Sequence, residues 1–256
     1  MGPVPIFLLE FTEDKIYKIR LKMKQEIIKD LHTIPRLEQV PYFVHGFGTK
    51  KWREADFKTK SKLKDYDLIF LNQTHSDIIQ HIDKIHDKKL KGDAMISSCP
   101  KLLLIIQTAD CLPVLFVDEL RKVIAAVHCG WRGTAKRLVQ KVIQRMRDNY
   151  GCRPSSLLVA LGPCLERECY EVGEDVFQSY EQGGHSTEFF QNHPIRKNKY
   201  LFDLKGSNLS QMISCGINKK NVYSIDFCTH CQKNLLSFRR DKEKTERMLS
   251  FIGMSF

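Results

Sequence analysis

The chain has 256 residues, of which 42% are hydrophobic and 28% are charged, enough to bury a substantial core and to predict one globular domain spanning residues 1–256. It has no run of roughly eighteen apolar residues, as a membrane helix needs, and no basic segment ahead of its N-terminal apolar patch, so we expect a cytoplasmic protein without a membrane partner. The net charge of +11 suits an anionic substrate, but the lysines gather in stretches without interleaved aromatic residues, so no nucleic-acid partner is expected.

In chain order, the first predicted element is an amphipathic helix within residues 17–34. We expect it to end before Pro35, because a proline disfavours helical geometry in the residue that precedes it. Short apolar runs then predict strands. These runs are "LLLIIQT" (102–108), "VLFVD" (114–118), "KVIAAVH" (122–128), "SLLVALG" (156–162) and "NVYSID" (221–226).

The clearest helix pattern lies between the third and fourth of these runs, in residues 134–151. Leu138, Val142 and Met146 recur at every fourth position, and Gly151 provides a stop. The strands are closely spaced, with few obvious crossover helices between them. This pattern predicts an α+β fold with mixed sheets covered by helices rather than a doubly wound parallel sheet.

The chain contains nine cysteines. Their odd number, the size of the domain and the lack of a signal peptide favour free thiols in a reducing compartment. Cys228 and Cys231 have the C-x-x-C spacing, and together with Cys164 and Cys169 they could form a structural zinc site, although the second spacing fits a zinc ribbon poorly.

Three widely separated residues, His75, Cys111 and His128, offer soft or borderline metal ligands. Two of them follow apolar runs that predict buried strands, so these side chains would emerge at strand ends, where a fold can gather distant residues around one point. Two imidazoles and one thiolate form a suitable donor set for zinc and leave a fourth tetrahedral position open. Each residue alone could equally be a core residue, because free cysteine is among the most buried residue types.

Eight segments occur in the order found in the laccase-domain proteins, also called polyphenol oxidases or purine nucleoside phosphorylases. They are "HGFGTK" (45–50), "NQTH" (72–75), "GDAMIS" (92–97), "TADCLPVLFVD" (108–118), "AAVHCGWRGTAKRLV" (125–139), "LGPCLERECYEVGEDV" (161–176), "YLFDL" (200–204) and the segment 228–252. The chain therefore resembles this family over residues 41–256, and residues 1–40 form an N-terminal extension of unclear role.

The resemblance implies a layered α/β/β/α sandwich with mixed sheets, related to the fold of the cytotoxic necrotising factor deamidases. It implies zinc, or copper in its place, held by His75, Cys111 and His128. It also implies phosphorolysis of adenosine, inosine or methylthioadenosine with phosphate as the second substrate, and some adenosine deamination. Zinc in such a site could act as a Lewis acid or lower the pKa of a bound water.

Further candidates surround this triplet in the sequence. Asp110 could orient a ligand or accept a proton, or could only cap a turn, and Asp93 carries the same two interpretations. Arg132 follows the third ligand in "GWRG" at a predicted helix start and could hold phosphate. Arg239 or Arg240 could also hold phosphate, or form an ion pair with a nearby aspartate.

His45 in "HGFGTK" could line the substrate pocket, or serve as a turn residue before Gly46. Compared with the family pattern, the segment after His45 is much shorter, Cys129 stands where alanine is common, and Glu246 stands where glycine is common. The shortened segment affects how much of a substrate the protein can cover, and Cys129 places a second thiol beside the candidate metal ligand His128.

Other function classes stay open from the residues alone. Cys111 and His128 could form a metal-independent thiol hydrolase or deamidase, or the chain could be a metal-stabilised binding module without activity. Copper oxidase chemistry is not expected, because multicopper laccases need many histidines in H-x-H pairs and this chain has nine scattered histidines and no such pair.

Overall fold

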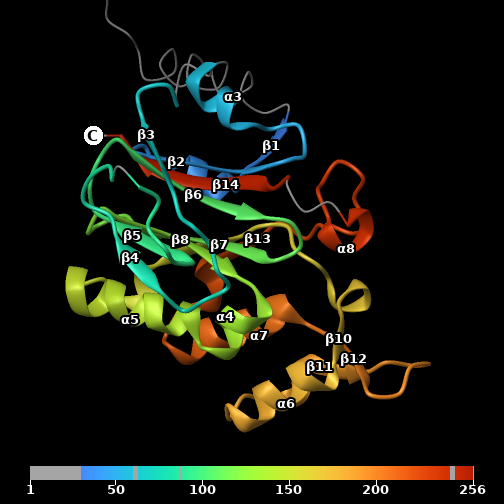
Figure 1. Cartoon of the computed structure of the whole chain (residues 1–256). Helices are drawn as coiled ribbons and strands as arrows, with labels where there is room; N and C mark the ends of the chain where they lie inside the picture. Colours follow the sequence, from blue (N-terminus) through green and yellow to red (C-terminus); the bar gives the residue numbers. More distant parts are fainter. Residues whose placement is uncertain (1–29, 60–62, 87, 243–245, 256) are drawn as a thin grey trace, which may run out of the picture.

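Two mixed β-sheets lie face to face in the computed structural model, which describes residues 30–59, 63–86, 88–242 and 246–255. Helices cover the outer side of each sheet, so the layers follow the order α/β/β/α (Figure 1). The predicted α+β class with mixed sheets in one domain is confirmed. Within the described ranges no helix combines the length and apolar content needed to cross a bilayer.

The five-stranded sheet has the order β1-β2-β14-β6-β3, with β3 parallel to β6 and the other pairs antiparallel. Its strands are β1 (Leu31–His32), β2 (Phe43–Gly48), β14 (Met248–Met254), β6 (Leu102–Thr108) and β3 (Asp67–Phe70). The short helix α2 (Pro35–Glu38) lies between β1 and β2, and α3 (Glu54–Thr59) covers the outer face.

The six-stranded sheet has the order β13-β9-β7-β8-β5-β4. Its strands are β13 (Val222–Ser224), β9 (Leu158–Leu161), β7 (Leu112–Asp118), β8 (Val123–Cys129), β5 (Ala94–Ser97) and β4 (Ile79–His81). Its outer face is covered by α4 (Trp131–Ala135), α5 (Leu138–Tyr150) and α7 (Leu204–Ser214).

A smaller three-stranded sheet lies at one end of the molecule (Figure 1). It has the order β10-β12-β11 and is accompanied by α6; the bounds are β10 (Glu171–Gly173), α6 (Glu174–Gln182), β11 (Phe190–Asn192) and β12 (Lys199–Phe202). The remaining helix, α8 (Phe238–Asp241), is a single turn before β14.

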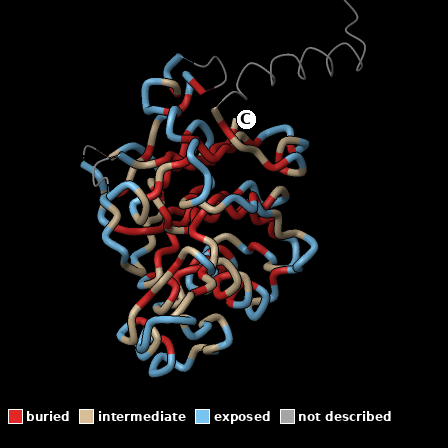
Figure 2. The backbone as a smooth tube through the Cα atoms, turned by 90° about the vertical axis from the view of Figure 1, so that its right-hand side faces the viewer, coloured by how far each residue is buried: buried red, intermediate tan, exposed pale blue. Residues whose placement is uncertain are grey.

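Three apolar clusters hold these layers together, and Figure 2 shows the buried segments concentrated in the middle of the molecule. One fills the space between the sheets, with Leu104, Leu115 and Ala126 fully buried. A second joins the six-stranded sheet to α5 and α7, and a third packs α3 on the outer face of the five-stranded sheet. Because β6, β7 and β8 have apolar contacts on both faces, they appear in the sequence as continuous apolar runs.

All five predicted strands are present, within two residues of their predicted ends in most cases. The helix predicted over 134–151 is interrupted: α4 ends at Ala135 and α5 begins at Leu138, because Arg137 has a left-handed backbone with φ of 61°. The predicted C-terminal stop is confirmed, since Gly151 caps α5 with φ of 66°.

The predicted end of the first helix is wrong. Leu31 and His32 form β1 and pair with Phe47 and Gly48 of β2, so tertiary pairing overrides the local helical pattern. Pro35 is the first residue of α2, where a backbone N–H would have no acceptor within the helix, so the N–H that proline lacks costs no helical hydrogen bond. The rest of that prediction, residues 17–29, lies outside the described residues.

Candidate metal centre and cavity

The fold brings His75, Cys111 and His128 together at one edge of the stacked sheets. Cys111 lies in the short link between β6 and β7, and His128 lies near the end of β8. His75 lies in the loop after β3 with a left-handed φ of 57°. One donor atom from each of the three residues lies within 4.8 Å of the other two, and Cys111 Sγ lies 3.9 Å from His75 Nε2.

The carboxylate of Asp93 fixes two of these three residues. Asp93 is fully buried just before β5 and accepts a hydrogen bond from Nδ1 of His128 at 2.8 Å. It also accepts the backbone N–H of His75 at 3.0 Å and both the N–H and the hydroxyl of Ser76 at 2.6 Å. Because the carboxylate only accepts, Nδ1 of His128 carries a hydrogen, and Nε2 is the ring atom left to bind a metal in place of a proton, the usual support of a metal-binding histidine.

The absence of a side chain at Gly130 allows this convergence. A Cβ atom built at Gly130 would lie 3.1 Å from Cys111 Sγ and 3.0 Å from Cδ2 of His75. Both distances are shorter than ordinary van der Waals contact, so a larger residue would push the thiol and the imidazole apart. The backbone φ of Gly130 is −84°, so the requirement is steric and does not concern backbone conformation.

Electrostatic coupling favours the charged thiol. Burial raises the pKa of Cys111, but the charge of His128 and hydrogen bonds from both histidines outweigh it and lower that pKa to about 6. Burial likewise opposes protonation of His128, while Cys111 and Asp93 raise its pKa to about 9. Hydrogen bonds from His128 and Ser76 overcome burial and lower the pKa of Asp93. Burial raises the pKa of the Cys129 thiol, next to His128 at the end of β8. The Cys129 side chain packs in the apolar cluster under α5 and α7 and is not one of the three candidate metal donors.

These residues fit a zinc ion on three grounds. The donors are a thiol that ionises readily and two imidazoles, one of them already oriented by a carboxylate. Tetrahedral bonds of 2.0–2.3 Å place neighbouring N and S donors about 3.6 Å apart, close to the 3.9 Å between Cys111 and His75. The small residue at Gly130 leaves room for the donors to converge.

The triplet lines a cavity of about 780 Å³. Its other lining residues include the basic side chains Lys89, Arg132, Arg239 and Arg247 and the aromatic side chains Trp131, Tyr170 and Phe238. Asp110 contributes the one carboxyl group among the described residues that line it. The cavity therefore combines a metal-binding donor set, an excess of positive charge and flat apolar surfaces.

Asp110 positions a neighbouring loop. One of its carboxylate oxygens accepts the hydroxyl of Thr229 at 2.6 Å and the other accepts the backbone N–H of Arg239 at 2.7 Å. Arg239 in turn donates to the carbonyl of Glu171 at 2.8 Å and lies over the ring of Tyr170 at 5.7 Å. Both carboxylate oxygens are thus engaged, and Asp110 holds the segment that carries Thr229 and Arg239, a role beyond the three considered from the sequence.

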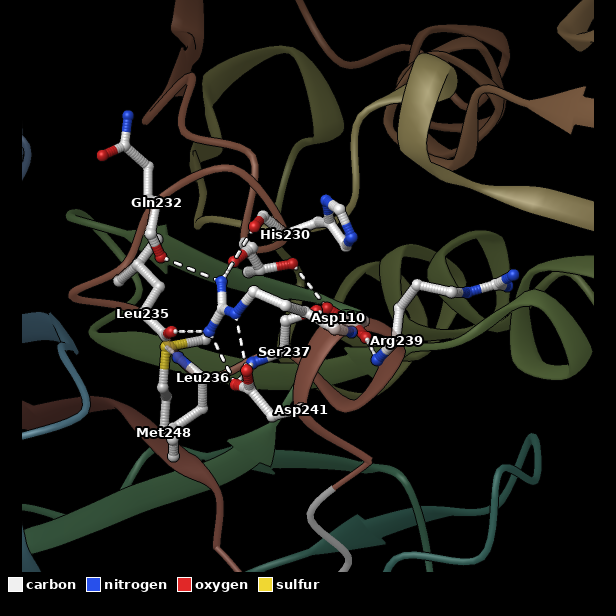
Figure 3. Close-up of polar contacts among 11 residues, drawn as sticks. Asp110, His230, Gln232, Leu235, Leu236, Ser237, Arg239, Asp241 and Met248 are labelled. Carbon is white, nitrogen blue, oxygen red and sulfur yellow. Dashed lines mark hydrogen bonds and ion pairs between the residues drawn. The ribbon is translucent and has the colours of Figure 1, made fainter.

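Arg240 does not line the cavity, so its predicted substrate contact is corrected. Its guanidinium donates to the carbonyls of Thr229, His230 and Leu235 at 2.8 Å and forms an ion pair with Asp241 at 2.6 Å. Figure 3 shows these groups directed at one guanidinium, while the side chain of Arg239 extends away from them. The single turn of α8 sends the two adjacent arginines to opposite sides.

The prediction for His45 is also corrected. His45 is buried in β2, and its Nε2 accepts the backbone N–H of Ile34 at 2.8 Å, so it fastens the chain before α2 to the sheet and does not line the cavity. Arg132 lines the cavity as predicted in α4, with its guanidinium carbon 4.3 Å from the centre of the Trp131 ring. The helix α4 has only five residues, which is too short for its N-terminus to form an anion site. Arg132 therefore contributes through its side chain and not through its position at the helix start.

Sequence reasoning missed several lining residues. Lys89 and Arg247 fall in segments that look like ordinary solvated surface, and Tyr170 looks like a core aromatic residue. Gln73 could have been found, since it stands two residues before His75: its side chain exchanges two hydrogen bonds of 2.8 Å with the backbone of Gln107 and so attaches the His75 loop to β6.

Comparison with known proteins assigns the chain to a family. Residues 52–255 match the family described as multi-copper polyphenol oxidoreductase laccase. The chain belongs to this family. Among its relatives, a protein of Clostridium acetobutylicum named purine nucleoside phosphorylase is 38% identical over 197 residues, covering 74% of this chain and 80% of the relative.

Further members of the laccase-domain family carry related names. A purine nucleoside phosphorylase of Deinococcus radiodurans is 34% identical over 188 residues, covering 73% of this chain and 70% of the relative. A protein named adenosine deaminase RL5, from an unknown prokaryotic organism, is 27% identical over 179 residues, covering 65% of this chain and 66% of the relative. The crystal structure of the hypothetical protein YfiH of Bacillus licheniformis covers 88% of this chain and 97% of its own, with a TM-score of 0.78 and 26% identity.

Proposed function

We propose that this protein is a zinc-dependent purine nucleoside phosphorylase that acts on adenosine, inosine and methylthioadenosine, with adenosine deamination as a secondary activity. His75, Cys111 and His128 hold the zinc, and a compartment that keeps thiols reduced, the cytoplasm, suits this donor set. The observation that carries the proposal is the cavity, in which a His-Cys-His donor set, four basic side chains and three aromatic side chains line one space. The names of the relatives agree with it.

The basic side chains would bind phosphate. Arg132 and Arg239 come from two separate helices, α4 and α8, and Lys89 and Arg247 add positive charge. A guanidinium offers two parallel N–H donors that match the oxygens of a phosphate, and such charge-assisted hydrogen bonds are among the strongest in proteins. Asp110 acts as a positioning residue, because it holds the backbone of Arg239.

The aromatic side chains would bind the nucleoside. Trp131 and Tyr170 lie beside Arg132 and Arg239 respectively, so a purine stacked on either ring would place its ribose near the phosphate. A phosphate oxygen then forms a bond to C1′ of the ribose while the C1′–N9 bond breaks. The bonding electron pair leaves with the purine, which takes up a proton, and ribose 1-phosphate remains. When bound, zinc supplies a Lewis acid at the floor of the cavity.

The test is incubation of the metal-analysed protein with each of the three nucleosides, with and without phosphate, followed by chromatography of the products. We expect free base and a sugar 1-phosphate only when phosphate is present, namely ribose 1-phosphate from adenosine and inosine and 5-methylthioribose 1-phosphate from methylthioadenosine, and a slower conversion of adenosine to inosine without it. The Cys111→Ala variant should lose the zinc of this site and turnover. Unchanged nucleosides under all conditions would contradict the proposal and favour a metal-stabilised binding module.

A second candidate, a metal-independent thiol hydrolase or deamidase, has one specific observation in its favour. Cys111, His128 and Asp93 form a chain of interactions in which the carboxylate orients the imidazole and the imidazole contacts the thiol, as a nucleophile with its base and orienting group would. A chelator separates the two functions. The phosphorylase should lose activity with the chelator, whereas a thiol hydrolase would stay active in it and be inactivated by iodoacetamide.

A further inference from the structure

A second group of metal-binding side chains lies outside the His75-Cys111-His128 site. The thiols of Cys169 and Cys231 and the imidazole of His230 place one donor atom each within 4.8 Å of one another. The two sulfur atoms lie 3.5 Å apart. The Cys228 thiol, three residues before Cys231 in the same turn, is the candidate fourth donor, although it lies outside the group whose donor atoms are all within 4.8 Å of one another.

The distance between the two sulfur atoms fits two ligands of one metal ion better than it fits a disulfide bond. Two sulfurs bound to one tetrahedral zinc at about 2.3 Å lie about 3.8 Å apart, near the 3.5 Å between Cys169 and Cys231. A disulfide would require about 2.05 Å. Cys164, the fourth cysteine of the sequence hypothesis, does not join this group. It is fully buried, and His230 takes its place.

The chain around these donors is already held in shape. Residues 228–232 form a closed turn, in which the N–H of Gln232 donates to the carbonyl of Cys228 at 3.0 Å. The guanidinium of Arg240 fixes the same turn through the carbonyls of Thr229 and His230 (Figure 3). The positive charge of this guanidinium would offset part of the negative charge of a thiolate-rich site.

We infer that Cys169, Cys228, Cys231 and His230 form a second, structural metal site for a zinc-class ion. Three thiolates and one imidazole are a donor set typical of closed, four-coordinate structural zinc, and the side chains are half-buried or exposed, so an ion can reach them. The ion would join η3 (Arg167–Cys169) to the turn before α8. Tyr170 directly follows Cys169, and Arg239 lies eight residues after Cys231 in α8, so the site would support two walls of the cavity without touching the substrate.

The test measures metal content and needs no enzyme assay, so its outcome is separable from that of the proposed function. The full chain is reduced with a phosphine, loaded with zinc, desalted and analysed for metal per chain. We expect about two zinc ions in the natural sequence and about one in either Cys231→Ser or Cys111→Ala. Cys215→Ser, which removes a half-buried thiol at the end of α7, is the matched control and should keep about two.

Cobalt(II) provides an independent readout in the Cys111→Ala background. There the thiolate-to-cobalt absorption should persist, and it should disappear when Cys231→Ser or Cys169→Ser is added; His230→Ala should shift it without abolishing it. Two results would overturn the inference. One is a single zinc ion per chain that Cys111→Ala removes and Cys231→Ser leaves in place. The other is a Cys169–Cys231 disulfide that forms again in the zinc-loaded protein, as mass spectrometry would show.

Discussion

Asp93 links the residues of the proposed zinc site. The Asp93→Asn substitution would keep the shape of the side chain but remove its negative charge. It would also direct an amide N–H₂ group, which donates hydrogen bonds, at N–H and O–H groups that are donors themselves. We predict that zinc affinity falls about 10- to 100-fold, as is usual when the partner of a ligating histidine is lost. A competition titration with a chromogenic chelator measures this. Asp77→Asn is the control, since Asp77 pairs with Lys136 and Lys141; equal affinities for the two variants would contradict the prediction.

Gly130 tests whether steric room determines ligand convergence. In Gly130→Ala the new methyl group would meet both Cys111 and His75, so we predict loss of most of the zinc at this site while the fold is retained. Gly133→Ala is the matched control three residues further on, where the added methyl would meet the carbonyl of Ser76 at 3.3 Å and the backbone oxygen of His128 at 3.7 Å, but no donor atom of the site. Metal analysis in the Cys231→Ser background isolates the site; full zinc content in Gly130→Ala would refute the steric argument.

Arg239 and Arg240 are adjacent but should fail in different ways. Arg239→Ala removes a cavity cation, and a charge-assisted hydrogen bond of about 1.5–3 kcal/mol corresponds to a KM for phosphate about 10- to 100-fold higher. Arg240→Ala leaves several loop carbonyls without a donor, so we expect a melting temperature several degrees lower. Steady-state kinetics and thermal unfolding of both variants check this, and an interchange of the two effects would contradict the assignment.

At the scale of elements, the strands that carry Cys111 and His128 could be predicted because they are buried on both faces and therefore appear as apolar runs. The break between α4 and α5 could not. The apolar spacing continues through it, and its causes are tertiary: the side chain of Gln211 binds the carbonyl of Thr134 at 3.0 Å and the guanidinium of Arg137 binds that of Gly183 at 2.9 Å. Likewise β1 exists only because β2 offers it an edge.

The outer helix α3 gives a prediction at this scale. Phe57 is fully buried and its ring packs edge-on against Trp52 at 5.5 Å and Phe251 at 5.1 Å. Phe57→Ala should lower the free energy of unfolding by about 3–5 kcal/mol. Chemical denaturation measures the loss, with the exposed Lys58→Ala as control. Because α3 lies on the far side of the five-stranded sheet from α4 and α5 (Figure 1), zinc content should not change; a joint loss of stability and zinc would contradict this separation.

For the whole molecule, the sequence was enough to predict that His75, Cys111 and His128 meet, but not which hydrogen bonds hold them in place. The three candidate metal donors could be named because their residue types are rare and their surrounding motifs are specific. The orienting carboxylate was open between Asp93 and Asp110, and only the sheet register separates them: Asp93 reaches His128 across the β5–β8 pair, whereas Asp110 faces the loop before β14. His45 was misplaced because a motif gives no side-chain direction.

The overall charge predicts a salt effect. The protein carries a net charge of +11, and four cations line the cavity with one carboxyl group that is already engaged. Phosphate binding should therefore weaken as ionic strength rises, because salt screens attraction to a partly open site. We expect the KM for phosphate to rise with potassium chloride while the KM for the nucleoside changes little, and sulfate to compete with phosphate. Equal salt effects on both constants would argue against a cationic phosphate site.

The position of β14 has a consequence for biosynthesis. This strand lies between β2 and β6, although β6 is about 140 residues earlier in the chain and β2 about 200. While the ribosome is still translating residues 110–247, β2 and β6 must wait with open hydrogen-bonding edges, and pairing over such sequence distances is slow. The nascent protein is therefore expected to depend on chaperones that shield those edges until residue 254 has emerged from the exit tunnel.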